Sequence, residues 1–131
     1  MDERIAALAD ARNISLTTYR RDGRAVATPV WFALDGANIL VWTDAASGKA
    51  KRIRANGRAG VARSDARGRT KSPSIDATAR ILPHSEDARA HRLFARKYRL
   101  LKPLVDLWTV ASYFVRRKPR PVEIFVEITL T

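Results

Sequence analysis

Apolar and polar residues alternate along several short segments of the chain, a period that is typical of half-buried β-strands. The segments with strand character are residues 14–19, 25–34, 39–43, 58–65, 74–82 and 122–130. Turn sequences separate the first three, because Asp22-Gly23 and Asp35-Gly36-Ala37-Asn38 lie between them. These three segments are therefore expected to form an antiparallel meander. The last segment has a valine, isoleucine or leucine at every second position and is expected to be a half-buried closing strand.

The spacing of apolar residues changes to a helical period in three other stretches. The predicted helices cover residues 2–11, 47–56 and 85–114, the last of them broken in two at Pro103. Ser47 is a suitable N-cap for the second helix, and Asn56-Gly57 is a suitable stop.

About six strands joined by hairpins, with helices inserted between them, favour a particular architecture. An antiparallel barrel removes its own free edges, whereas a parallel doubly wound sheet would need a helix after every strand. The sequence therefore predicts an α+β fold, an antiparallel β-barrel with inserted and flanking helices. A length of 131 residues is that of one domain, so residues 1–131 are expected to form a single unit.

Pro29 interrupts the second strand segment. Proline has no N–H group and cannot donate a hydrogen bond to a neighbouring strand. One side of this strand near Pro29 is therefore expected to be unpaired, at a sheet edge, a bulge or an opening that faces a ligand.

The chain is strongly basic. Its 25 lysines and arginines exceed its 13 acidic residues, which gives a formal net charge of +12. Such a field concentrates anions near the surface, and the candidates are a phosphorylated coenzyme, a nucleic acid or an acidic membrane. The start of the chain, Met1-Asp2-Glu3-Arg4, is charged and unlike the apolar core of a signal peptide, so a cytoplasmic location is expected.

Several kinds of chemistry have no support in the sequence. The absence of cysteine excludes disulfides, thiolate zinc sites and iron–sulfur clusters. His84 and His91 belong to no metal or catalytic motif, so no metal site is expected. Neither the dinucleotide-binding glycine pattern nor the P-loop pattern occurs. A borrowed cofactor would therefore have to supply the chemistry of an enzyme built on this chain.

The best candidate for an anion site is the start of the second predicted helix. Thr43 and Ser47 bring hydroxyl groups to a helix N-terminus, where free backbone N–H groups favour a phosphate. Lys49 adds a formal charge in the first turn, and Lys51, Arg52 and Arg54 extend the positive surface. A capped helix with solvated basic residues would show the same pattern.

A set of short motifs spread over almost the whole chain is similar to those of a known family. The motifs are Ile14-Ser15-Leu16-Thr17-Thr18, Asp22-Gly23, Ala27-Thr28-Pro29-Val30-Trp31-Phe32, Val41-Trp42-Thr43, Ser47-Gly48-Lys49, Ala59-Gly60-Val61 and Ala77-Thr78-Ala79. With them the sequence resembles the pyridoxamine 5'-phosphate oxidase-like split-barrel superfamily, and particularly its actinobacterial branch of deazaflavin (coenzyme F420)-dependent reductases. The resemblance implies a split β-barrel and a homodimer with the cofactor in a groove between protomers.

The resemblance also implies site residues and an activity. The deazaflavin or flavin ring would lie along Thr28, Pro29, Val30 and Trp31. The phosphate would lie at Thr43, Ser47 and Lys49, with Arg54 nearby. The implied function is an F420-dependent oxidoreductase that transfers hydride between the deazaflavin and a small organic substrate, which the sequence does not identify.

One departure from the family pattern bears on the choice of cofactor. The flavin mononucleotide (FMN) oxidases of the superfamily have an arginine immediately before the phosphate lysine, and Gly48 stands there in this chain. The loss of that group favours F420 over FMN. F420 also carries an oligoglutamate tail, which would suit the surplus of basic residues, among them Lys51, Arg52, Arg54, Arg58 and Arg63.

Three alternatives stay open at the level of the sequence. One is an FMN- or heme-binding protein on the same barrel, and another is a basic barrel that binds nucleic acid through stacking and phosphate contacts. Against the nucleic-acid alternative, no nucleic-acid motif is present. The third concerns location, because residues 104–118 combine an apolar run with a basic flank. This segment is too short to span a bilayer and suits contact with a membrane surface.

Overall fold

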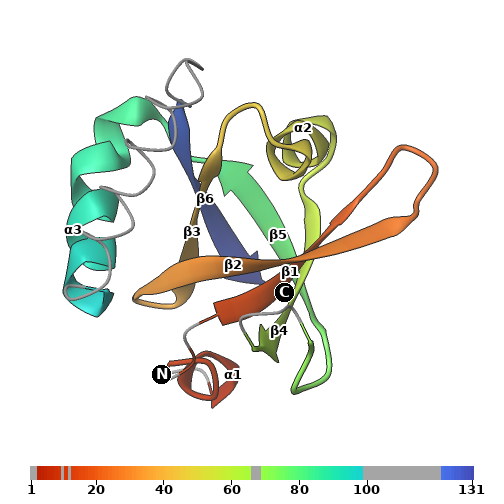
Figure 1. The fold of residues 1–131 in the computed structure, drawn as a ribbon, viewed down its shortest axis with the longest axis horizontal. Helices are drawn as coiled ribbons and strands as arrows, with labels where there is room; N and C mark the ends of the chain where they lie inside the picture. Colours follow the sequence, from red (N-terminus) through yellow and green to blue (C-terminus); the bar gives the residue numbers. More distant parts are fainter. Residues whose placement is uncertain (1–2, 10, 12, 66–68, 99–121) are drawn as a thin grey trace, which may run out of the picture.

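The structure is a computed structural model that describes residues 3–9, 11, 13–65, 69–98 and 122–131. In chain order the elements are α1 (Glu3–Ala6), β1 (Asn13–Tyr19), β2 (Ala25–Asp35), β3 (Asn38–Asp44), α2 (Gly48–Ala55), β4 (Arg58–Ser64), β5 (Ile75–Ile81), the 3-10 helix η1 (His84–Glu86), α3 (Asp87–Lys97) and β6 (Glu123–Leu130). The strands form a closed antiparallel barrel in the order β1-β2-β3-β6-β5-β4. The predicted α+β barrel of six strands is confirmed (Figure 1).

The two predicted hairpin turns account for the meander β1-β2-β3. Gly23 and Gly36 have positive φ angles of 89° and 61°, a backbone region that glycine enters without a steric penalty. Strand β1 pairs with β2 from Asn13↔Trp31 to Tyr19↔Ala25, and the tip of this hairpin extends past α2 in Figure 1.

Strand β2 is paired with a different neighbour in each part of its length, with β1 over Ala25–Trp31 and with β3 over Phe32–Asp35. Strand β3 pairs with Phe32–Asp35 and with no earlier residue of β2. In a two-residue hairpin the flanking pair, here Asp35 and Asn38, exchanges backbone hydrogen bonds, so every second residue back to Pro29 points its backbone groups to the β3 side. The missing N–H of Pro29 therefore faces the side that β3 does not reach. The unpaired side predicted from the proline is confirmed.

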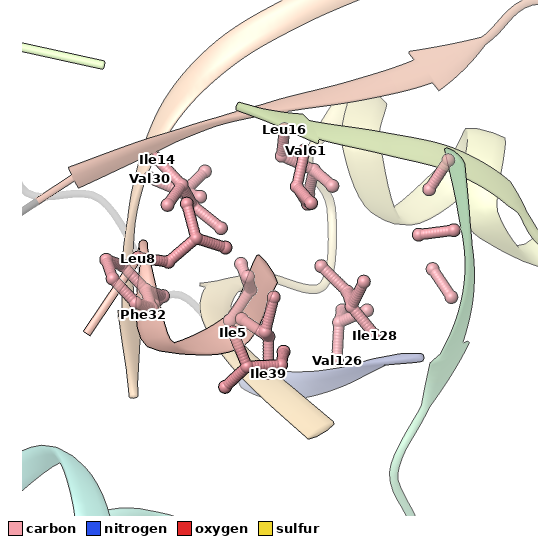
Figure 2. Close-up of a cluster of buried hydrophobic side chains, with 14 of the residues drawn as sticks. Ile5, Leu8, Ile14, Leu16, Val30, Phe32, Ile39, Val61, Val126 and Ile128 are labelled. Carbon is pink, nitrogen blue, oxygen red and sulfur yellow. The ribbon is translucent and has the colours of Figure 1, made fainter. Parts of the chain in front are cut away.

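The barrel interior holds a continuous apolar core. Figure 2 shows side chains from α1, the strands and the segment after α1 meeting there. The fully buried ones include Ile5, Leu8, Ile14, Leu16, Phe32, Ile39, Val41, Val61, Val126 and Ile128. Burial of each such side chain stabilises the fold by roughly 1.5–3 kcal/mol. The N-terminal helix is shorter than the predicted 2–11, and both Ile5 within it and Leu8 just after it are buried.

A second apolar cluster lies outside the barrel, under α3. Phe94 and Ala90 of this helix pack with Leu40 of β3 and Phe125 of β6. The expectation that β6 is half-buried is therefore wrong at Phe125, which is 1% exposed, because α3 covers the outer face of the barrel there. Glu127 and Thr129, on the same face of the strand, remain accessible to solvent.

The described part of α3 ends at Lys97, and the predicted continuation to residue 114 with its break at Pro103 lies outside the described residues, as does the 104–118 segment. Among the residues that are described, no helix is long and apolar enough to cross a membrane.

Candidate cofactor-binding site

The start of α2 is capped as the sequence predicts. Ser47 has an extended backbone, and its Oγ accepts a hydrogen bond from the N–H of Ala50 at 3.2 Å. The same Oγ lies 3.3 Å from Oγ1 of Thr43, at the end of β3. The N–H groups of Gly48 and Lys49 in the first turn have no carbonyl of the helix to bond. The structure thus brings two hydroxyl groups together beside free N–H donors.

Lys49 carries its charge in a partly buried position in this first turn. Burial lowers the pKa of its ammonium group, the nearby Arg52 guanidinium lowers it further, and Asp44 opposes the shift. A cation placed close to another cation and to the positive end of a helix dipole is destabilised. An anion at this position would relieve that repulsion.

Arg52 is held beside the same turn by a long-range hydrogen bond. Its Nε donates to Oγ1 of Thr18 on β1 at 2.7 Å. A Cβ on Gly48 would lie only 2.8 Å from Nη1 of Arg52, so the absence of a side chain at residue 48 leaves room for the guanidinium. From the sequence, Arg52 stands out only as one of the surplus basic residues. A usable signal is its spacing of four residues from Gly48, which puts the two on one face of the helix.

Arg54 has a different position from the other predicted site residues. Its Nη1 donates to the carbonyl of Ala45 at 3.0 Å, so it holds the loop that precedes α2. Its predicted contact with the cofactor stays a prediction. Lys51 is exposed on the same helix.

The four predicted ring contacts on β2 are divided between two faces of the strand. Val30 is buried and Thr28 is half-buried on the barrel side, whereas Pro29 is exposed on the other side. Trp31, also on the outer side, is stacked on the ring of Tyr98 with a centroid distance of 4.4 Å and an interplanar angle of 11°. What the four residues have in common is that they lie on the part of β2 that β3 does not pair with.

Thr28 links this edge to the start of α2. Its Oγ1 is buried and has no hydrogen-bond partner among the described residues. Thr28 pairs with Leu16 on β1, and Thr18 is the next β1 residue on that face. Thr28 and Thr18 are thus diagonal neighbours on one face of the β1-β2 hairpin. Because Thr18 binds Arg52, strand β1 connects the two parts of the predicted site.

The donor set fits a phosphate ester better than a metal ion. Lys49 and Arg52 supply cations, and Ser47, Thr43 and the first turn of α2 supply hydroxyl and N–H groups. Within the described ranges, histidine and acidic side chains nowhere gather in groups of three that could share a metal ion.

Each of the two histidines contacts residues outside the start of α2. Nδ1 of His84 lies 3.0 Å from Oδ2 of Asp87 at the start of α3. The ring of His91 packs edge-on against Trp42 and Phe125. Neither histidine is in contact with Lys49 or Arg52 through any interaction in the described structure.

Comparison with known proteins places the chain in a family. The family model of pyridoxamine 5'-phosphate oxidase matches residues 1–119 of the 131. The chain belongs to the pyridoxamine 5'-phosphate oxidase family. The resemblance seen in the sequence is confirmed at this level. No curated protein matches the sequence.

The solved structures that resemble this member of the pyridoxamine 5'-phosphate oxidase family carry names that refer to different cofactors. An FAD-binding protein from Mesorhizobium loti superposes with a TM-score of 0.66 at 20% identity, covering 98% of this chain and 85% of its own. An F420 reductase gives 0.61 at 17% identity, with 95% and 91% covered. The heme storage protein HutZ from Vibrio cholerae gives 0.65 at 11% identity, with 99% and 89% covered. At these identities the likeness establishes the fold.

Proposed function

We propose that this protein is an F420-dependent oxidoreductase that transfers hydride between the deazaflavin and a small organic substrate. The observation that supports it best is the pair of closely placed cations, Lys49 and Arg52, at the capped start of α2. Arg52 is anchored to Thr18 of β1, the diagonal neighbour of Thr28, whose hydroxyl has no partner among the described residues. A phosphate at the helix and a ring along the strand edge would satisfy both features.

The bound deazaflavin would supply the hydride chemistry, and the residues of the chain would position it. Lys49, Ser47 and the first-turn N–H groups would hold the phosphodiester. Along the β2 edge, the backbone groups that β3 leaves unpaired could meet the polar atoms of a planar ring. Trp31 would border this ring from a position fixed by its stacking on Tyr98. Preformed contacts of this kind lower the entropic cost of orienting reactants.

The basic surface around the site supports F420 rather than FMN. F420 ends in several carboxylates, whereas FMN ends at its phosphate. Arg58 is exposed at the start of β4, so it could meet such a tail. A fold relative that is named as an F420 reductase agrees with this choice. The glycine at residue 48 favours F420 over FMN less strongly than the sequence suggests, because Arg52 places a guanidinium in the space beside it.

The proposal includes a homodimer. A ring on the open edge of β2 would be covered on one side by the described residues of a single chain, and a second copy would close the groove. Exclusion of water from such a groove strengthens the electrostatic contacts inside it.

Direct binding tests the assignment of the cofactor. The purified protein would be titrated in parallel with oxidised F420, with FMN and with heme, and the dissociation constants would be compared. We expect F420 to bind most tightly. FMN binding that equals or exceeds F420 binding would overturn the F420 assignment, and heme binding with no affinity for either flavin-like cofactor would favour a heme protein on the same barrel.

A further inference from the structure

Arg52 is positioned as a ligand-binding group more than as a surface charge. Thr18, which accepts from Nε, is 0% exposed, so the guanidinium is fixed at a buried point of the barrel. Among the described residues, Nη1 and Nη2 of Arg52 have no hydrogen-bond acceptor, although arginine offers five N–H donors in a planar fork. The end of the fork beside Gly48 is therefore free to bind a ligand.

The surroundings of Arg52 favour an anionic ligand. Arginine is normally stabilising at the C-terminal end of a helix, and here its charged end lies against the first residue, Gly48, where the helix dipole is positive. Lys49 is the neighbouring cation, and Asp44 is the acidic residue that partly offsets it. A phosphate between the two cations would turn this repulsion into attraction.

We propose that Arg52 binds the cofactor phosphate with its guanidinium, in the space left open by the missing side chain of residue 48. The inference rests on the proposed function for the presence of a phosphorylated cofactor. Gly48 is then the residue that admits Arg52 to the anion site, and Thr18 is the residue that positions it. The guanidinium comes from one helical turn later in the chain instead of from residue 48.

Two substitutions on α2 separate this role from general basicity. Arg52→Met removes the guanidinium and keeps an apolar stem of similar length, and Lys51→Met removes one positive charge from an exposed neighbour. The dissociation constants of F420 and FMN would be measured for both variants. We expect Arg52→Met to weaken binding by about 10- to 150-fold, the range for a charge-assisted hydrogen bond, and Lys51→Met to weaken FMN binding by less than about threefold.

A third variant controls for loss of folding. Gly48→Ala keeps Arg52 and every charge, and alanine is favoured over glycine in a helix. Its Cβ would displace the end of the Arg52 side chain, so we expect weaker cofactor binding with unchanged or higher thermal stability. Unchanged affinity in Gly48→Ala would argue that the guanidinium does not need its observed position, and would overturn the proposal.

The outcomes distinguish this inference from the proposed function. If FMN binds and F420 does not, the proposed function fails, but an Arg52→Met loss of FMN affinity still supports the inference. If F420 binds tightly and Arg52→Met behaves like Lys51→Met, the function stands and the inference is overturned. A wild-type protein that binds neither cofactor overturns both.

Discussion

The hydroxyl group of Tyr98 makes two hydrogen bonds to one residue of β2, and its removal has a predictable cost. It donates to the carbonyl of Phe32 at 3.0 Å and accepts from the N–H of Phe32 at 3.1 Å, in a buried position. Tyr98→Phe keeps the stacking ring and leaves both backbone groups unpaired. Each unsatisfied buried group costs roughly 1–3 kcal/mol, so the free energy of unfolding should fall by about 2–6 kcal/mol.

Urea denaturation followed by tryptophan fluorescence and by circular dichroism would measure this change. Tyr19→Phe is the matched control, since Tyr19 lies on β1 and contacts Arg58 through its ring, with no hydrogen bond from its hydroxyl among the described residues. The control should change the unfolding free energy by less than about 0.5 kcal/mol. A Tyr98→Phe variant as stable as the control would refute the view that this hydroxyl fixes α3 on β2.

Three further predictions follow from charge and assembly. Burial raises the pKa of Tyr98 to about 12 from 10.0, so its contribution to stability is complete below pH 10 and should be lost between pH 10 and 12. The loss, about 3 kcal/mol at about 1.4 kcal/mol per pKa unit, should be absent in Tyr98→Phe when unfolding is followed over this range. Burial lowers the pKa of Lys49 below 10.5, so its ammonium group loses its proton earlier as the pH rises. Cofactor affinity should therefore decrease with rising pH before pH 10.5 is reached, and Lys49→Ala should not show this decrease. Light scattering should find a dimer, and a strict monomer at micromolar concentration would remove the groove between two protomers.

Local sequence signals were sufficient for most of the barrel. Hairpin turns at Asp22-Gly23 and at Gly36 need positive φ angles, and such sequences are uncommon outside turns. Ser47 predicted the start of α2 because a hydroxyl cap is satisfied within one turn of chain. Pro29 predicted the unpaired edge of β2 for the equally local reason that it has no N–H.

Contacts between distant parts of the chain could not be predicted in the same way. Phe125 is buried because α3 covers it, and alternation along β6 describes only the strand itself. The position of Arg52 depends on Thr18, which is 34 residues away in sequence. The four-residue spacing of Gly48 and Arg52 could have shown that they share a helix face, but only the fold shows the guanidinium anchored on β1.

The most direct test of an F420 site at the start of α2 compares two lysines on that helix. Lys49 lies partly buried in the first turn and Lys51, two positions further, is exposed and points about 200° away. The dissociation constant of F420 would be measured for Lys49→Ala and Lys51→Ala under the same salt conditions. We predict that Lys49→Ala weakens binding by about 10- to 150-fold, or about 1.5–3 kcal/mol, and that Lys51→Ala has a much smaller effect. Equal, small losses in both variants would contradict a phosphate site at the start of α2, because the helix would then be a solvated basic face and the phosphate would lie elsewhere.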